Sequence, residues 1–266
     1  MNRIRARFAL RGLAPVLLLL AAACAGVGSA ERLSVTTRTE SGTTTAPPAG
    51  EVAARKNALV RFVHAVPGLA AVDLYAGDSK AFGAAAYKTA TAYAELPSAS
   101  GVYRLRLAGQ EMAEPLAEET ESFGTGRHHT VVAAPARASG LFAKGGGAEL
   151  HFLADEFEAP AAGRARVRVF NASPDLDEVE LYASGRAVPL VKGARFGAAT
   201  AYAEAEPSAS GLEVRRAGEN ITTLSVPGQG VEAGGLYTVF IAGGTKGAAK
   251  LEAFVVEDRL GAPGAR

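Results

Sequence analysis

The chain has 266 residues, of which 48% are apolar and 21% charged. This composition allows two domains with cores of their own and excludes a chain that is disordered throughout. The 28 Lys and Arg residues nearly balance the 27 Asp and Glu residues. Four of the arginines lie in the first eleven positions, so the remainder is mildly acidic. It lacks the basic patch that a nucleic-acid partner requires, and none is expected.

The N-terminus has the pattern of an export signal. Its early arginines precede an apolar run, Leu13–Ala23, that is too short to span a bilayer. The only cysteine, Cys24, follows three alanines. This arrangement is similar to the cleavage site of a bacterial lipoprotein, although Ala21 stands where that site prefers leucine. We predict a signal peptide over 1–24 and lipidation of Cys24, which would anchor the protein to a membrane.

A second processing route stays open. The small residues Gly28, Ser29 and Ala30 suit an ordinary signal peptidase, which would remove Cys24 and yield a periplasmic or secreted protein. If Cys24 is lipidated instead, we expect the outer membrane or the cell surface. Residues 25–55 are rich in Ser, Thr, Pro, Gly and Ala. Such a segment cannot bury enough apolar surface to fold, so we predict a flexible, disordered linker.

The rest of the chain contains one unit twice. RVRVFNASPDLDEVELY at 166–182 repeats the pattern of LVRFVHAVPGLAAVDLY at 59–75, at an offset of 107 residues. A period this long exceeds that of solenoid repeats, so we predict a duplicated domain, at 56–158 and 164–260. Further matching pairs are TAYAE at 91–95 and 200–204, PSASG at 97–101 and 207–211, HTVVAA at 129–134 with YTVFIA at 237–242, and FLADE at 152–156 with FVVED at 254–258.

Each copy has the sequence pattern of a β-sandwich. Runs rich in β-branched and aromatic residues, such as LVRFVH and VDLYA, often alternate in polarity and are separated by Gly, Pro, Ser or Asp. With a weak strand at 80–85, about seven strands per copy are predicted, which indicates an antiparallel sandwich. The nearest approach to a helix, PLAEETESF at 115–123, is short. Because the connecting segment 158–165 is also short, we expect the sandwiches to lie close together, end to end.

The order of these elements resembles the DUF4397 family of bacterial exported domains. Both copies contain V-R-[VF]-x-[HN]-A-x-P, then V-[DE]-L-Y, TAYAE, a P-x-x-x-G turn and a closing strand with Thr-Val. The resemblance covers about residues 57–258 and implies an all-β fold of two tandem immunoglobulin-like antiparallel β-sandwiches. It implies no catalytic residues, because the family has no assigned activity. The second copy departs from the pattern at 187–197, where inserted residues affect the register of the middle strands.

Histidines are the first candidates for a functional site. His64 ends the first strand of one copy, and Asn171 takes its place in the other. Only histidine of the two titrates near neutral pH or commonly binds zinc, so the exchange favours hydrogen bonding to the Ala-x-Pro turn that follows. His128 and His129 would point to opposite faces of a strand. We therefore do not expect them to bind one metal ion together with His151.

Other repeated motifs also favour structural roles. PSASG lacks the G-x-S-x-G pattern of a nucleophile and is predicted to be a turn. The glycines at 144–148 and 234–238 adjoin strands, which predicts hairpin loops rather than phosphate-binding loops. Three equivalent pairs are expected on a solvated sheet face, where they could form a ligand-facing patch: Asp73 with Glu180, Glu95 with Glu204, and Tyr75 with Tyr182.

These patterns predict a non-enzymatic, exported cell-envelope protein with a lipid anchor. We expect it to bind a protein or glycan partner through loops or exposed strand edges. No catalytic residue, cofactor or metal site is predicted. Two alternatives stay open, namely a structural spacer or assembly subunit of the envelope, and an envelope hydrolase with a site between the domains. A cluster of His, Asp and Ser in a pocket would favour the hydrolase, and an exposed apolar patch would favour binding.

Overall fold

The computed structural model of the protein describes residues 57–137, 147–207, 211–226, 231–244 and 249–258. All of them belong to one compact unit, 43–266. The predicted signal peptide, Cys24 and the linker at 25–55 lie outside the described residues. Within the described ranges, no helical segment has the length and hydropathy of a membrane span.

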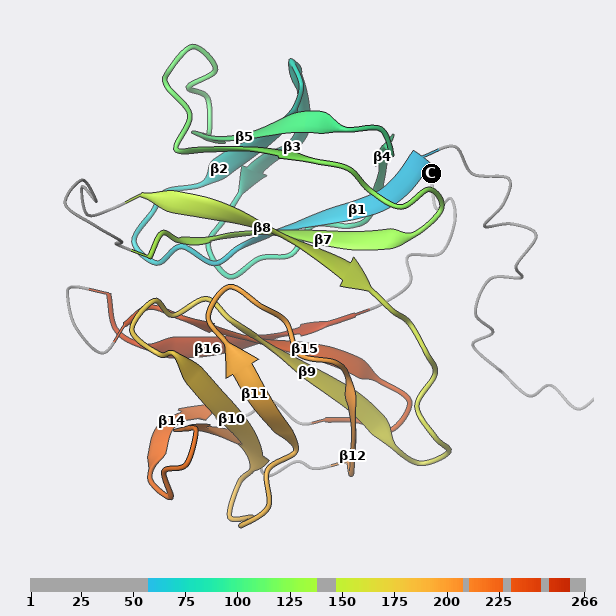
Figure 1. Cartoon of the computed structure of the whole chain (residues 1–266), viewed down its shortest axis with the longest axis vertical. Helices are drawn as coiled ribbons and strands as arrows, with labels where there is room; N and C mark the ends of the chain where they lie inside the picture. The colour runs from blue at the N-terminus through green and yellow to red at the C-terminus, as the bar shows by residue number, and fades with distance from the viewer. Residues whose placement is uncertain (1–56, 138–146, 208–210, 227–230, 245–248, 259–266) are drawn as a thin grey trace, which may run out of the picture. The chain divides into compact units, whose positions relative to one another are not determined.

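In the described parts of the chain, each repeat has eight strands in two four-stranded sheets (Figure 1). The prediction of an all-β chain with two sandwiches is therefore confirmed. The strands of repeat 1 are β1 (Asn57–His64), β2 (Val72–Ala76), β3 (Ser79–Ala85), β4 (Ala94–Pro97), β5 (Gly101–Leu107), β6 (Ala117–Glu121), β7 (His128–Pro135) and β8 (Ala148–Asp155). Those of repeat 2 are β9 (Ala165–Asn171), β10 (Glu178–Ala183), β11 (Val191–Arg195), β12 (Ala203–Ala205), β13 (Leu212–Arg216), β14 (Thr222–Val226), β15 (Leu236–Ala242) and β16 (Glu252–Glu257).

The two repeats share one topology. One sheet of each repeat, which we call the inner sheet, has the order β4-β1-β7-β8 in repeat 1 and β12-β9-β15-β16 in repeat 2. The outer sheets have the orders β3-β2-β5-β6 and β11-β10-β13-β14. Within the inner sheets, β1 pairs with β7 and β9 with β15 in parallel. The expectation of purely antiparallel pairing is wrong for these strands, because the chain crosses to the outer sheet and back before it returns beside its first strand.

The sequence pattern does not predict strand β6. Its residues AEETE lie in the segment with the nearest approach to a helical pattern, and Ala and Glu favour helices. At the edge of a sheet, however, charged side chains can face solvent, and pairing with β5 outweighs this propensity. Glu118 accepts a hydrogen bond of 2.6 Å from Nε of Arg104 on β5. The weak strand expected at 80–85 is confirmed as β3.

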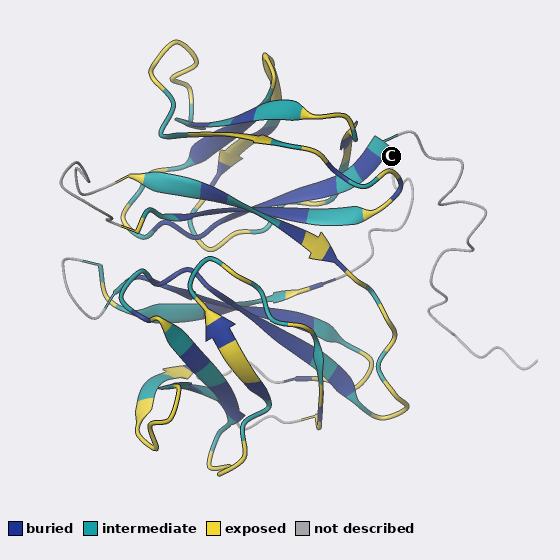
Figure 2. Cartoon of the chain, viewed as in Figure 1, coloured by how far each residue is buried: buried dark blue, intermediate teal, exposed yellow. Residues whose placement is uncertain are grey.

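Alternation along β1 divides its side chains between two cores. Ala58, Val60 and Phe62 point into the core of repeat 1, whereas Val63 points from the opposite face of the sheet. The inner strands β1, β7, β9 and β15 are accordingly buried over most of their length (Figure 2). Such strands need cover on both faces.

That cover comes from the other repeat. A third apolar core joins the inner sheets, which pack against each other through side chains of both repeats. The sandwiches are therefore not arranged end to end, and that expectation is wrong. The short connecting segment is compatible both with an end-to-end arrangement and with face-to-face packing of the inner sheets. Because the inner strands are buried on both faces, the sheets pack face to face. The buried members of this core are Val63, Ala65, Val132, Ala134, Leu153, Phe170, Ala172, Phe240, Ala242 and Phe254.

Strand pairing fixes which residues are equivalent in the two repeats. The stretches at 59–75 and 166–182 form the first two strands of each repeat, as expected. At the end of each repeat, His151 lies opposite Val132, and Phe254 lies opposite the equivalent Phe240. His151 thus corresponds to Phe254, so the sequence match of FLADE with FVVED is one residue out of register. A slip of one residue assigns every side chain to the wrong face of a strand.

Candidate functional site

Two pairs of oppositely charged side chains are buried between the repeats. Arg61 of β1 binds Asp258, which follows β16. Arg168 of β9 binds Asp155 of β8. All four side chains are at most 3% exposed. Each of these arginines therefore pairs with an aspartate of the other repeat, and neither of the two pairs lies within one repeat.

Threonine hydroxyls connect these pairs in the same way on both sides. Oγ1 of Thr130 accepts a hydrogen bond of 2.8 Å from Nε of Arg61 and donates one of 2.6 Å to Asp155. Thr238 makes the two equivalent contacts, also at 2.8 and 2.6 Å. Each threonine thus links the arginine and the aspartate of its own repeat, which joins the two ion pairs into one network.

Tyrosines complete this interface network. Tyr93 donates a hydrogen bond of 2.7 Å to Asp155, and Tyr202 donates one of 2.6 Å to Asp258. The guanidinium of Arg61 lies 5.1 Å from the ring centroid of Tyr93, and the equivalent contact to Tyr202 measures 4.7 Å. The interface network comprises Arg61, Tyr93, Thr130 and Asp155 of repeat 1 with Arg168, Tyr202, Thr238 and Asp258 of repeat 2.

The electrostatics of this network fix its charge state. Burial acts to raise the pKa of Asp155, but the charges of Arg168 and Arg61 and the hydrogen bond from Thr130 hold that pKa below its usual value. Burial and the nearby carboxylates raise the pKa of both Tyr93 and Tyr202. The aspartate stays ionised and the tyrosines stay neutral. Because these groups are bound to one another, the network favours a structural role over a catalytic one.

His64 and Asn171 bind the turns that follow them, as expected. Nδ1 of His64 accepts a hydrogen bond from the backbone N–H of Val66 (3.2 Å), and Nε2 lies 3.2 Å from the carbonyl oxygen of Ala70. Asn171 accepts from the backbone N–H two residues on (3.0 Å) and donates to the carbonyl of Leu176 (2.8 Å). Burial lowers the pKa of His64. Both side chains therefore stabilise the equivalent turn of their own repeat by hydrogen bonds.

The other histidines do not converge. The ring of His128 lies against Tyr93, with centroids 5.1 Å apart. Nε2 of His129 accepts a hydrogen bond from the backbone N–H of Gly124 (3.1 Å), and His151 lies 3.0 Å from Glu149. Among the described residues, no group of three or more His, Cys, Asp or Glu side chains is arranged to hold a metal ion.

The expected solvated face is wrong for Asp73 and both tyrosines of the V-acid-L-Y motif. Asp73 is 2% exposed, and Tyr75 and Tyr182 are also buried. Long cationic side chains cover the rings: Nζ of Lys80 lies 5.7 Å from the Tyr75 centroid, and the guanidinium of Arg215 lies 4.0 Å from that of Tyr182. Asp73 binds Lys80 (3.0 Å) and a backbone N–H of β3. These contacts join neighbouring strands within the outer sheets.

The glycine and serine motifs lie where turns were expected, as far as they are described. PSASG at 97–101 connects β4 to β5. Of its copy at 207–211, residues 208–210 lie outside the described part of the chain, as do 144–146 of KGGGA. GGLYT leads into β15, and Gly234 has a φ of 83°, a conformation that favours glycine. The prediction of a hairpin loop at 234–238 is wrong, because β14 and β15 belong to different sheets.

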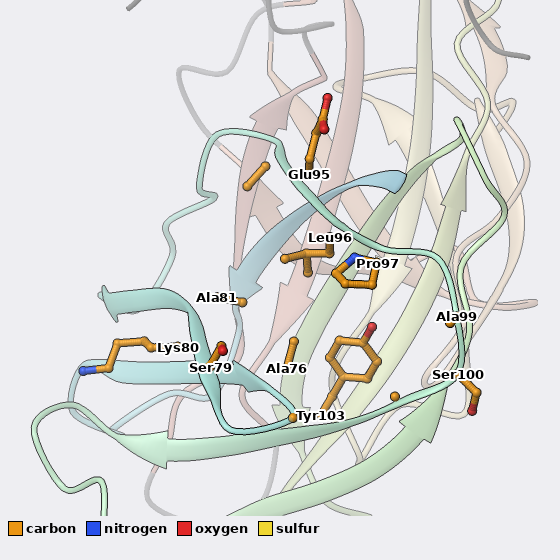
Figure 3. Close-up of a pocket in the computed structure, with 13 residues that line it drawn as sticks. Ala76, Ser79, Lys80, Ala81, Glu95, Leu96, Pro97, Ala99, Ser100 and Tyr103 are labelled. Carbon is orange, nitrogen blue, oxygen red and sulfur yellow. The ribbon is translucent and has the colours of Figure 1, made fainter. Parts of the chain in front are cut away.

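An open apolar cleft lies within repeat 1, lined by both β3 and β4, the terminal strands of its two sheets (Figure 3). Its volume of about 550 Å³ is in the range of ligand pockets. Leu96, Pro97 and Tyr103 are among the residues that line it. Figure 3 shows that Lys80 and Glu95 direct their charged ends away from these apolar side chains. The cleft can accept an apolar group, and its rim offers charge.

A small side chain leaves this cleft open. Ala81 of β3 lines it, and Leu190 holds the equivalent position in repeat 2. In each repeat, one residue of the neighbouring strand lies opposite the leucine of V-acid-L-Y: Phe82 in repeat 1 and Val191 in repeat 2. Ala81 and Leu190 directly precede these two residues. Leu190 packs against the core of repeat 2. The sequence did not predict the cleft. The segments that contain Ala81 and Leu190 align only loosely, so their difference in size indicates a cleft only once strand pairing shows that the two positions are equivalent.

The interface network can be tested by replacing Arg168 with methionine. This change leaves Asp155 buried without its nearest cation, so we expect the free energy of unfolding to fall by about 3–5 kcal/mol. Denaturant unfolding at pH 7, followed by circular dichroism, measures it. The Asp155 contribution is present above the ordinary aspartate pKa of about 3.9 and is lost as pH falls through its lowered pKa.

Arg164→Met is the matched control, because Arg164 forms an exposed pair with Glu206 at 3.2 Å. Its loss is expected to cost at most about 1 kcal/mol. Equal, small effects of both substitutions would contradict the inference that the network holds the repeats together.

Acid is expected to weaken the fold through His151. Burial among groups of repeat 2 lowers its pKa, although Glu149 acts to raise it. The unfolded chain then binds a proton more readily, so stability falls as pH drops below about 6.5 toward the folded pKa. His151→Phe, which introduces the residue found at the equivalent Phe254, should reduce the loss of Tm between pH 7 and pH 5. An unchanged loss would argue against this role. Because burial also lowers the pKa of His64, His64→Asn measures separately the contribution of a buried histidine outside the shared core.

Comparison with known families agrees with this duplicated architecture. The sequence model of a domain of unknown function (DUF4397) matches residues 58–182 and again 165–266. The two matches overlap at 165–182, which contains β9 and most of β10, the strands that repeat the pattern of β1 and β2. No curated protein matches the chain. Both the matched segments and the strands thus repeat, and the chain belongs to the DUF4397 family.

Proposed function

We propose that this protein is a non-enzymatic binding module of the cell envelope, held at the membrane by a lipid on Cys24, and that the cleft of repeat 1 receives its partner. The observation that carries the proposal is the open apolar cleft between β3 and β4. Apolar surface that is accessible rather than packed is typical of binding sites. The equivalent position in repeat 2 is filled by Leu190, so the core of a repeat does not require the opening.

The hydrolase alternative has less support. None of the four histidines is among the residues that line the cleft. A second small pocket, of about 110 Å³, is lined by residues of both repeats, including Glu158 and Arg166, but by no histidine, serine or cysteine. Arg168, which also lines it, is bound to Asp155. The cleft is lined by Ser79 and Ser100, but no histidine lines it with them to act as their base.

The spacer alternative is favoured by the shared core and the interface network. An apolar core and two buried ion pairs join the repeats into one compact unit. Such a unit could hold other envelope components apart. It also serves the binding proposal, because repeat 2 then supports the sheet that carries β4 and the cleft.

Photo-crosslinking in the protein's own cells tests the binding site. We expect p-benzoylphenylalanine at Ser79, on the rim of the cleft, to form crosslinks that Ala81→Leu abolishes by filling the cleft. Leu190 at the equivalent position indicates that the fold tolerates leucine there. The same probe at Ala187, in an exposed loop of repeat 2, is the control. Crosslinks at Ser79 that persist in the Ala81→Leu variant would contradict the proposed binding site.

The lipid anchor is tested by metabolic labelling with a palmitate analogue. Wild-type protein should carry the label and remain with membranes after lysis, whereas Cys24→Ser should lose both properties. An unlabelled wild type would instead support removal of Cys24 by an ordinary signal peptidase, and the binding module would then be secreted or periplasmic.

A further inference from the structure

We infer that the cleft of repeat 1 binds an extended peptide, which adds a strand to the free edge of β4 and places an apolar–basic–apolar stretch against the cleft. The inference rests on the proposed function and names the chemical class of its partner. Three features of β4 carry it: the direction of its backbone groups, the charge of Glu95 and the cleft beneath its inward side chains.

Hydrogen bonds of β1 show which backbone groups of β4 face outward. The N–H of Leu59 donates to the carbonyl of Arg127, on the β7 side (2.9 Å), so Leu59 turns its backbone groups away from β4. Glu95 lies directly opposite Leu59 in the antiparallel pair. In such a pair both residues point their N–H and C=O groups away from each other. The N–H and C=O of Glu95 therefore point to the open edge, where an added strand can pair with both.

The other strand that lines the cleft is less suited to pairing. The register of β3 against β2 shifts twice, and Ala84 has a φ of 49°. The N–H of Ala84 is bound to Oδ1 of Asp73 (2.7 Å). Bulges and irregular backbone of this kind protect a sheet edge from strand addition. The pairing of β4 with β1 has no such shift. Its open edge offers the N–H and C=O of Glu95, although Pro97, which ends the strand, has no N–H to donate. Of the two strands, β4 is thus the one that an extended peptide would use.

The charge of Glu95 is not met within repeat 1. Glu95 is exposed and accepts a hydrogen bond from the side-chain amide of Asn57 (3.4 Å), but no Lys or Arg of the described chain forms an ion pair with it. In repeat 2 the equivalent Glu204 lies opposite Arg166, whose Nε is 3.8 Å from its carboxylate. Leu59 takes the place of that arginine in repeat 1. A basic residue of the added strand, opposite Glu95, would supply the missing charge.

Strand alternation then fixes what lies beside that basic residue. Ala94 and Leu96 flank Glu95 and belong to the core of repeat 1, so the neighbours of a basic residue opposite Glu95 would point into the cleft. The space left by Ala81 receives an apolar side chain there. A glycan fits less well, because Tyr103, the aromatic residue of the wall, is only 2% exposed and offers no face for a sugar to stack on.

Selection of random dodecapeptides displayed on phage, against the full chain, tests this inference. We expect enriched peptides with one Lys or Arg between two apolar residues. Ala81→Leu should weaken their binding about tenfold or more, because it fills the cleft. Glu95→Pro removes the outward N–H and should weaken binding about tenfold, the equivalent of one hydrogen bond. Glu95→Gln should weaken only peptides with the basic residue, and Ala187→Leu should change nothing.

A proline at this position is tolerated best on an edge strand, and circular dichroism checks that the Glu95→Pro variant is folded. N-methylation of the peptide backbone measures the same hydrogen bonds without changing the protein. Peptides whose binding is sensitive to Ala81→Leu, but not to Glu95→Pro or N-methylation, overturn strand addition and leave the proposed cleft function standing. The same conclusion follows if no peptide is enriched but the chain binds arrayed glycans or dimerises, and Ala81→Leu abolishes that binding or dimerisation. Absence of any ligand sensitive to Ala81→Leu overturns both proposals.

Discussion

Reciprocal pairing of a buried arginine of one repeat with a buried aspartate of the other is the constraint on which the rest of this structure depends. A buried charge without its partner costs several kcal/mol, and Arg61 and Asp155 both find their ionic partners in repeat 2. The same faces of the inner sheets carry the apolar core shared by the repeats. An inner sheet on its own would expose that apolar face and leave both charges unmatched. The duplication therefore produced one cooperative body, in which each repeat supplies half of the interface that the other needs.

This constraint explains where the two repeats have diverged and where they have not. The arginine, threonine, tyrosine and aspartate of the interface network occur in both copies, because a change in one copy removes the partner of a residue in the other. Positions with only local partners are freer. His64 and Asn171 differ in type but bind equivalent turns. Leu59 and Arg166 differ in charge, and Ala81 and Leu190 differ in size. The repeats have become unequal at the open edge of the sandwich. They also differ in the apolar part of the interface, where Phe240 and Phe254 of repeat 2 correspond to Val132 and His151 of repeat 1.

Sequence patterns predict the local structure well and the assembly poorly, for physical reasons. Polarity alternation and turn residues identify β1, β2, β9 and β10, because these patterns follow directly from the pleat of a strand. They miss β6, whose helix-forming residues are overridden by edge pairing with β5. They also miss the interface. An arginine in a strand is expected to face solvent, and the sequence pattern does not show that Arg61 and Arg168 are paired with aspartates of the other repeat. The relevant aspartates are hidden by a slip of one residue, which aligns Asp155 with Glu257 in place of Asp258. Sequence repeats reveal equivalence only approximately, whereas strand pairing sets it residue by residue.

The same comparison separates the part of the chain that holds the structure together from the part that is free to bind. In the interface network, the carboxylate of Asp155 is bound to an arginine, a threonine and a tyrosine, so a ligand could enter only by displacing strong internal contacts. At the edge of β4 the balance is reversed. Glu95 has an outward backbone pair and forms no ion pair with the described residues, whose side chains leave the cleft beside it open. In repeat 2, Arg166 lies beside the glutamate equivalent to Glu95, and Leu190 packs against the core at the position equivalent to the cleft. In repeat 1, a complementary strand would supply both the charge and the apolar contact that water now replaces. Repeat 2 thus serves as an internal reference for what repeat 1 leaves unsatisfied, and the chemistry of those missing groups, a cation flanked by apolar side chains, is the basis of the peptide that we propose as the partner.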